Sequence, residues 1–231
     1  CFATMASRTR CGSGRWYFAF IKEKLMAHVY DTKAQAPAAA STGGYTALTC
    51  IVTINCAVDA TLLTLAVIVG GLTARAGGSP IYNSVTMTNS PTSTVSSGGE
   101  GMVEYWYLPS PSTGGNYLCE VPNTGQIRLR LIASSYKATS GYISVIDVAS
   151  SGSSTASANP TASITTTAGG DVIVGAAFDG LATAPTARSH TSLYENDDGS
   201  FSRSAQYFLQ ASAGATTLSW TLASDDYAVI L

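Results

Sequence analysis

Few side chains of this chain have the types and spacing that catalysis needs, and the two histidines come first. His28 lies in the N-terminal tail, so a Ser-His-Asp triad could use only His190. The neighbouring Ser189 is not in a Gly-x-Ser-x-Gly sequence, and no helix is expected after it, which excludes the nucleophile elbow of a hydrolase. Two histidines are also too few for a His-rich metal site. We therefore predict no catalytic residue and no enzyme, and we interpret His190 as a loop histidine.

Acidic residues gather in turn-like segments, where acid–base catalysis and calcium binding are the functions to consider. Asp197-Asp198 and Asp225-Asp226 are adjacent pairs, and Asp is favoured in turns because it bonds to its own backbone. Acid–base catalysis instead needs two carboxylates held at a defined separation across a cleft. The segment 195–200, Glu-Asn-Asp-Asp-Gly-Ser, lacks the spaced acidic residues and the terminal Glu of an EF-hand loop. We predict a hairpin turn there, with calcium as the alternative, and no metal or other cofactor.

Aromatic side chains are the candidates for ligand binding. Tyr105 and Tyr107 lie in one aromatic run, and Tyr194 and Phe201 flank the acidic turn. Such rings can stack on a sugar, although cross-strand packing is the commoner use of aromatics on strands. We take these four residues as the candidate ligand-binding set.

The aromatic run belongs to the segment that organises the chain, residues 102–111, Met-Val-Glu-Tyr-Trp-Tyr-Leu-Pro-Ser-Pro. Its residues favour β structure, and the two prolines end the run. Period-two alternation places one set of side chains on each face: Met102, Trp106 and Leu108 on one, and Val103, Tyr105 and Tyr107 on the other. We predict a central strand with Trp106 as its largest buried side chain.

The segment Gly125–Ser134 shows the clearest alternation of apolar and charged residues. Its apolar residues share one face and its arginines the other: Ile127, Leu129 and Leu131 inward, Arg128 and Arg130 outward. This pattern is typical of a half-solvated sheet. We therefore interpret both arginines as solvated side chains rather than a phosphate site.

Further strand patterns recur at short intervals. Pro80–Met87 is predicted to be a hairpin with Asn83-Ser84 in its turn, and the sequence of Asp171–Asp179 echoes that of Asp59–Val67. The remaining predicted strands are residues 46–55, 60–70, 141–149, 162–167, 193–195, 201–210, 216–222 and 227–231, with a polar loop at 88–101 and a long Ser/Gly/Thr loop after 149.

These segments define the fold class. About a dozen short strands with turn chemistry between them are typical of an all-β protein. We predict a two-sheet antiparallel β-sandwich of jelly-roll or immunoglobulin-like type over residues 45–231. Residues 1–44 are predicted to be an N-terminal tail and linker, because 27–44 include the linker-like sequence Ala-Gln-Ala-Pro-Ala-Ala-Ala-Ser-Thr-Gly-Gly.

The charge distribution sets the first 25 residues apart. They carry five basic residues against one acidic residue, net +4, whereas residues 26–231 carry 7 against 13, net −6. Lys22-Glu23 can be encoded AAG-GAG, a ribosome-binding sequence two codons before Met26. We therefore expect a reading frame cut from a longer DNA fragment, with its true start at Met26 and a few residues missing at its end. A positively charged transit or tail-like segment is the alternative.

Overall charge and hydropathy exclude two classes of partner. The formal net charge is −2 and charged residues make up 11% of the chain, so we expect no nucleic-acid partner. A membrane helix over residues 51–72 would contain Asn55 and Asp59, and the apolar run that follows is shorter than the roughly 20 residues that a span needs. We expect no membrane partner.

The cysteines indicate no obligatory disulfide. Cys1 and Cys11 lie in the N-terminal segment. Cys50 and Cys56 would be roughly 20 Å apart on one extended strand, too far for a bridge. Cys119 could pair with either of them and would leave one thiol unpaired. This usage suits a reducing cytoplasm.

Several segments together resemble a β-sandwich domain found in bacterial secreted and surface proteins and in phage structural proteins. They are Asp59–Val67, Ile81–Met87, Glu104–Leu108 with Pro111 and Gly114, Thr165–Val174 and Leu218–Leu222, so the resemblance spans roughly residues 45–231. In place of Asn83-Ser84 the family more often has Asn-Gly, which leaves the turn type open.

The resemblance implies a non-catalytic role. We expect a structural or surface-exposed virion component of decoration, tail or fibre type, assembled in the host cytoplasm. Its partners would be other virion proteins or further copies of itself. The alternative is a secreted, extracellular or cell-surface adhesin or carbohydrate-binding module that binds a cell-surface glycan.

Overall fold

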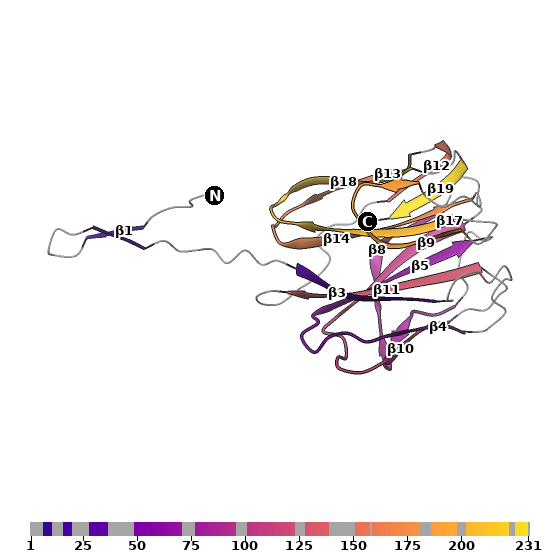
Figure 1. The fold of residues 1–231 in the computed structure, drawn as a ribbon, viewed down its shortest axis with the longest axis horizontal. Helices are drawn as coiled ribbons and strands as arrows, with labels where there is room; N and C mark the ends of the chain where they lie inside the picture. Colours follow the sequence, from indigo (N-terminus) through magenta and orange to yellow (C-terminus); the bar gives the residue numbers. More distant parts are fainter. Residues whose placement is uncertain are drawn as a thin grey trace.

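The structure is a computed structural model of the chain. It describes residues 7–10, 16–19, 28–36, 49–70, 77–95, 101–122, 128–138, 151–157, 159–180, 186–197, 202–221 and 225–230. All regular elements among these residues are β-strands (Figure 1). Every strand pairing among them is antiparallel. The predicted all-β antiparallel class is therefore confirmed.

The first large sheet has five strands in the order β3-β11-β5-β9-β8. These are β3 (His28–Ala36), β11 (Arg128–Ala138), β5 (Leu62–Gly70), β9 (Gly101–Pro109) and β8 (Thr88–Val95). The middle strand, β5, is a nearly continuous run of apolar residues and is buried on both faces. That composition suits a strand that is covered by protein on each side of its sheet.

A four-stranded sheet covers one face of this sheet, in the order β4-β10-β6-β7. Its strands are β4 (Thr49–Ile54), β10 (Tyr117–Pro122), β6 (Ile81–Tyr82) and β7 (Val85–Thr86). The predicted hairpin is confirmed, because β6 pairs with β7 across Asn83-Ser84. Both turn residues have positive φ, 45° and 67°, which identifies a type I′ turn.

The second half of the chain forms another five-stranded sheet and a three-stranded sheet. The five-stranded sheet has the order β12 (Ser151–Ser157), β19 (Asp225–Ile230), β14 (Asp171–Asp179), β17 (Ser202–Gln210) and β16 (Thr191–Asp197). The three-stranded sheet has the order β13 (Thr161–Thr166), β18 (Gly214–Thr221) and β15 (Ala187–Arg188). A separate hairpin near the N-terminus pairs β1 (Ser7–Arg10) with β2 (Trp16–Ala19).

The four larger sheets are stacked in layers (Figure 1), and a cluster of buried side chains lies between each pair of neighbouring layers. The first core lies between the four-stranded sheet and the first five-stranded sheet, and includes Leu65, Trp106 and Cys119. The second core lies between the second five-stranded sheet and the three-stranded sheet, and includes Ile173 and Trp220. Between the two five-stranded sheets is a third cluster, which we call the seam: Ala66, Ile68, Val103, Tyr105, Ile132, Ala176, Phe178, Leu193, Tyr194 and Ala205.

The structure corrects several details of the predicted architecture. The described strands form more than two sheets. Part of the predicted linker, His28–Ala36, is strand β3, which pairs with β11 along its length. The Asp31 carboxylate fixes this strand by accepting hydrogen bonds from Ser135 Oγ at 2.6 Å and from the Ala57 backbone N–H at 2.9 Å. β3 is an edge strand with few large apolar residues, so its sequence gave no clear apolar alternation.

Three other assignments also change. The predicted polar loop at 88–101 contains strand β8, the predicted loop after residue 149 contains strand β12, and strand β10 was not predicted. The strands predicted at 46–55 and 60–70 are confirmed as β4 and β5, and they take the place of the membrane helix that was weighed against them. The predicted strand at 141–149 lies outside the described residues.

Candidate functional site

The candidate ligand-binding tyrosines lie mostly inside the molecule. Tyr105 is 5% exposed and Tyr194 is 7% exposed, and both belong to the seam. Tyr107 is half-buried, and Phe201 lies outside the described residues. The second five-stranded sheet covers the face of β9 that was expected to be open. Tyr105 and Tyr194 therefore have no ring face available for stacking on a sugar.

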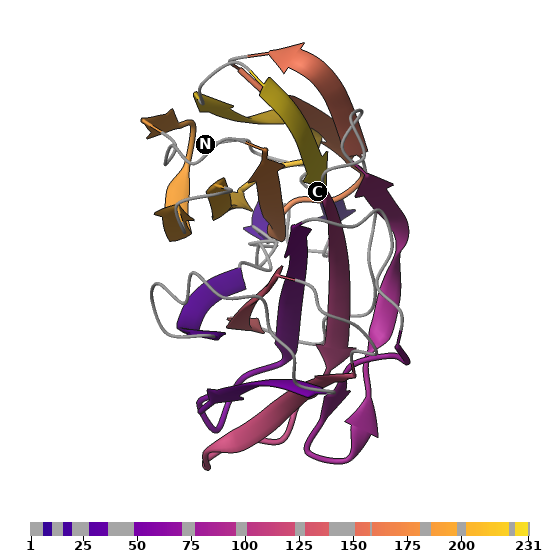
Figure 2. The same cartoon turned by 90° about the vertical axis from the view of Figure 1, so that its right-hand side faces the viewer.

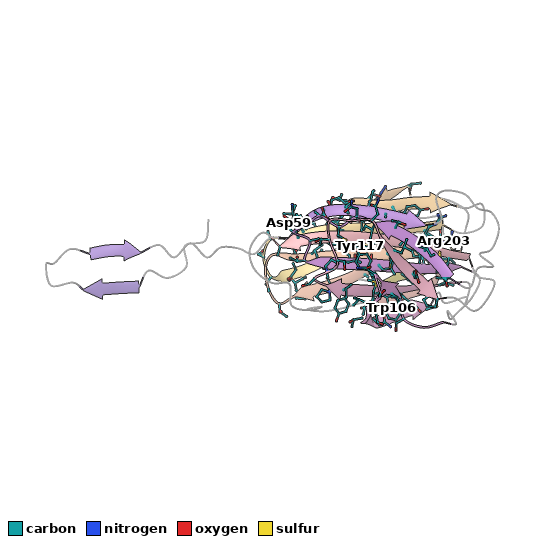
Figure 3. The ribbon with its side chains drawn as sticks, turned by 90° about the horizontal axis from the view of Figure 1, so that it is seen from below. Asp59, Trp106, Tyr117 and Arg203 are labelled. Carbon is teal, nitrogen blue, oxygen red and sulfur yellow. The ribbon has the colours of Figure 1, made fainter. Side chains whose placement is uncertain are left out.

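Trp106 occupies the position that its sequence pattern predicts. Trp106 is labelled in Figure 3. It lies on the same face of β9 as Met102 and Leu108, and all three belong to the first core. Its indole Nε1 donates a hydrogen bond to Glu104 Oε2 at 3.0 Å. Trp106 is therefore a structural side chain whose polar atom is satisfied within its own strand.

Arg130 was expected to be solvated, and the structure contradicts that interpretation. Its side chain is 2% exposed, and its guanidinium carbon lies 5.4 Å from the centroid of the Tyr194 ring. Arg203 on β17 is also 2% exposed and shares a strand face with Ala205 of the seam. Two buried guanidinium groups are therefore part of the packing between the two five-stranded sheets. The side chain of Arg128 lies outside the described part of the chain.

Three tyrosines extend the seam at one end. The rings of Tyr30 and Tyr207 are stacked with centroids 5.0 Å apart, and Tyr136 meets each of them edge-on at 6.1 and 6.0 Å. The hydroxyl of Tyr136 lies 3.0 Å from Ser134 Oγ, and burial raises the pKa of this phenol. These groups contact one another closely, so we interpret the cluster as a packing contact with polar groups that links strands β3, β11 and β17.

The cysteines of the strand region are buried thiols of the first core. Cys50, Cys56 and Cys119 are all free and fully buried, so no disulfide forms among the described residues. Burial raises the pKa of Cys50 to about 11 and that of Cys119 to about 12. A thiol acts as a nucleophile or metal ligand in its deprotonated form, so these three side chains are inert packing groups.

The remaining polar candidates do not assemble into a reactive site within the described residues. The His190 ring packs on Phe208 with centroids 4.4 Å apart. Ser189 Oγ accepts a hydrogen bond from the Ser219 backbone N–H at 3.0 Å. No group of three or more His, Cys, Asp or Glu side chains suited to a metal ion occurs in the part of the chain that is described. Residues 198–200 of the acidic turn are outside it.

One exposed surface has a composition that the sequence analysis did not single out. On β13 and β18, alternate residues point into the second core: Ala162, Ile164, Leu218 and Trp220. The residues between them point away from the core, and we call them the hydroxyl face: Thr161, Ser163, Thr165, Ala215, Thr217, Ser219 and Thr221. None of these seven side chains is charged. Ser163 Oγ and Thr217 Oγ1 lie 2.7 Å apart across the two strands.

The hydroxyl face has a sequence signal that can be recognised afterwards. Thr-Ala-Ser-Ile-Thr at 161–165 and Ala-Thr-Thr-Leu-Ser-Trp-Thr at 215–221 each place a small residue at every second position. Period-two alternation assigns those residues to one face of a strand. The sequence does not show that the two strands are neighbours, because Ala215 lies 50 positions after Thr165.

The opposite outer layer presents apolar residues. Ile51 on β4 and Leu118 on β10 point away from the first core and are 42% and 45% exposed. Glu120 pairs in register with both Ile51 and Ile81, so a carboxylate lies in the middle of this face. The two outer sheets of the molecule therefore differ in chemistry.

The chain has no significant match among known protein families, curated proteins or solved structures. The resemblance described under Sequence analysis thus remains an expectation. None of the described residues forms a helix with the length and hydropathy of a membrane span.

Proposed function

We propose that the chain is a non-enzymatic structural or surface-exposed component of a phage particle, of decoration, tail or fibre type. In this proposal its layers are β-sandwiches of jelly-roll or immunoglobulin-like type. The observation that carries it is the hydroxyl face of β13 and β18, whose outward side chains are all Thr, Ser or Ala.

The composition of this face suits a permanent protein contact. Burying a Lys or Glu side chain costs up to about 2 kcal/mol of conformational entropy, and its charge must also leave water. Ala loses no rotamer freedom, and the short Ser and Thr side chains have little to lose. Their hydroxyls both donate and accept hydrogen bonds, so they can pair with a partner strand or loop. The expected partners are other virion proteins or further copies of the chain.

The four aromatic candidates give little support to the alternative function, a secreted adhesin or carbohydrate-binding module. Tyr105 and Tyr194 are buried in the seam. Tyr107 is the one candidate among the described residues that retains substantial exposure.

The proposal can be tested on phage particles purified from a host that carries the gene. Mass spectrometry should detect the chain at a stoichiometry comparable with that of other structural proteins. Thr217→Lys should lower its incorporation, because a buried ammonium on the hydroxyl face is costly. Val58→Lys is the matched control, since Val58 is 81% exposed and lies outside that face.

Two results would overturn the proposal. The first is absence of the wild-type chain from purified particles. The second is a gene neighbourhood of secretion or polysaccharide genes rather than capsid and tail genes.

A further inference from the structure

The two halves of the chain have the same strand order. In the first half the five-stranded sheet is β3-β11-β5-β9-β8, and its partner sheet is β4-β10-β6-β7. In the second half the corresponding sheets are β12-β19-β14-β17-β16 and β13-β18-β15. Taken in chain order, β3, β4, β5, β6, β8, β9, β10 and β11 correspond to β12 through β19, and each strand has corresponding neighbours in its sheet. Strand β7, the second strand of the short hairpin, has no counterpart among the described residues.

Burial follows the same correspondence. Strand β4 alternates so that Cys50, Val52 and Ile54 are buried, and β13 alternates so that Ala162, Ile164 and Thr166 are buried. On β10 and β18, alternate residues face the local core, namely Cys119 and Val121 in one half and Leu218 and Trp220 in the other. Two halves could have the same strand order by chance, because a few types of connection between strands are very common. The corresponding strands also bury the same one of their two faces, and chance explains this second agreement less well.

The seam joins corresponding surfaces of the two halves. Ala66 and Ile68 of β5 and Val103 and Tyr105 of β9 lie on one side of it. On the other side are Ala176 and Phe178 of β14 and Ala205 of β17, and β14 and β17 are the counterparts of β5 and β9. Figure 2 shows the first half, coloured indigo to pink, below the orange and yellow second half.

One contact in the seam shows how closely the two halves approach. A Cβ atom added to Gly101 would lie 2.4–2.6 Å from three ring carbons of Phe178. Phe178 is fully buried, and Gly101 is the first residue of β9. The glycine therefore provides the space in which the aromatic ring of the other half packs.

From these observations we infer that the chain contains two copies of one β-structural unit, residues 28–138 and 151–230. The seam face of each five-stranded sheet is a docking surface for a second copy of the unit. Within the chain the second copy is already covalently attached, so the two units form an internal pair. This inference does not depend on the proposed virion role.

Separate folding of the units is tested in the full-length chain by hydrogen exchange. Leu218→Ala removes a fully buried side chain from the second core, and Leu65→Ala does the same in the first core. Leu218→Ala should lower amide protection in β13, β14 and β18 by about 30-fold or more, and leave that of β4 and β10 within a few-fold. Leu65→Ala should give the reverse pattern. Equal loss of protection in both halves after either substitution would overturn the division into units.

Docking is tested by cutting the folded chain between the units. A protease site is inserted within residues 139–150, and the cut protein is analysed by size-exclusion chromatography. The two fragments should elute together in a 1:1 complex, because the seam buries mostly apolar side chains from both units. Ile132→Lys places an ammonium in the seam, on the same strand face as the buried Arg130, and should separate the fragments, with the wild-type second fragment keeping its strand circular dichroism.

Leu118→Lys is the matched control, since Leu118 is 45% exposed on an outer sheet, and its fragments should stay together. Three results would overturn the docking surface. They are separation of the wild-type fragments after cutting, co-elution despite Ile132→Lys, and loss of strand signal from the released wild-type second fragment.

Discussion

Strand β9 is buried on both faces, and this gives a quantitative prediction for two adjacent aromatic residues. Trp106 is 8% exposed in the first core, and Tyr105 is 5% exposed in the seam. Replacing a buried large aromatic residue by alanine costs about 3–5 kcal/mol, because it leaves a cavity and forfeits transfer free energy. We expect Trp106→Ala and Tyr105→Ala each to lower the free energy of unfolding by that amount. Without the second five-stranded sheet over its face of β9, Tyr105→Ala would be the milder change.

The assay is thermal unfolding followed by circular dichroism. For a chain of about 150–250 residues, each 1 kcal/mol shifts Tm by about 2–4 °C, so both variants should melt roughly 6–20 °C below wild type. Tyr107→Ala is the matched control on the same strand. Tyr107 is half-buried, and we expect its loss to cost about 1 kcal/mol.

Trp106→Phe separates packing from hydrogen bonding. Phenylalanine keeps most of the apolar contact and removes the Nε1 donor that lies 3.0 Å from Glu104 Oε2. We expect a loss of about 1–3 kcal/mol, the usual cost of removing one partner of a buried hydrogen bond. A Tyr105→Ala protein that melts within a degree or two of wild type would refute the packed seam. A Trp106→Ala protein that melts normally but loses binding to a glycan or partner would make the aromatic run a recognition surface.

Four further predictions follow from other parts of the chain. Ser84→Gly should raise the free energy of unfolding by about 0.5–1 kcal/mol in urea titrations, because Ser84 has φ 67° and glycine avoids the Cβ strain there; an unchanged or lower value would contradict this. The truncated chain 26–231 should keep the thermal midpoint of the full chain, since β1 and β2 pair with each other, and a loss of more than a few degrees would reject the idea. Raising the pH from 9 to about 11–12 should progressively lower the free energy of unfolding, because burial raises the thiol pKa of Cys50 and Cys119, so these thiols ionise at lower pH in the unfolded chain. In urea titrations Cys119→Ala should lessen this loss at alkaline pH, and an unchanged loss would argue against a buried neutral thiol. Millimolar calcium or EDTA should leave Tm unchanged if the acidic turn holds no ion, whereas a calcium-dependent rise would indicate a site.

The alternation of residue types within single segments predicted well which side chains share one face of a strand. The alternation in residues 102–108 correctly placed Met102, Trp106 and Leu108 together in the first core. Asn83-Ser84 correctly marked a tight hairpin turn, and the positive φ angles show its type. These features depend on residues close to one another in sequence, so a single segment contains the information.

The candidate site was predicted less well. Tyr105 and Tyr194 were candidates for an open surface, and Arg130 was interpreted as solvated, yet all three are buried. In each case the sequence assigned the side chain to a face and could not show what covers that face. Arg130 lies against Tyr194, 64 positions further along the chain.

Edge strands were the other class of error. Strands β8 and β12 consist mostly of Ser and Thr, and β3 has few large apolar residues, so all three show weak apolar alternation. They are held chiefly by backbone hydrogen bonds to one neighbouring strand, and side-chain patterns report such bonds poorly.

The sequence by itself therefore determined that the chain forms antiparallel strands, where several of them turn, and which residues share a face. It also contained the paired Thr/Ser alternations that become the hydroxyl face. The tertiary structure decided which sheets lie against one another, so that one face of β9 meets the first core and the other meets the seam. The physical reason is that side-chain alternation is a property of one strand, whereas burial depends on a second sheet contributed by residues far away in the chain.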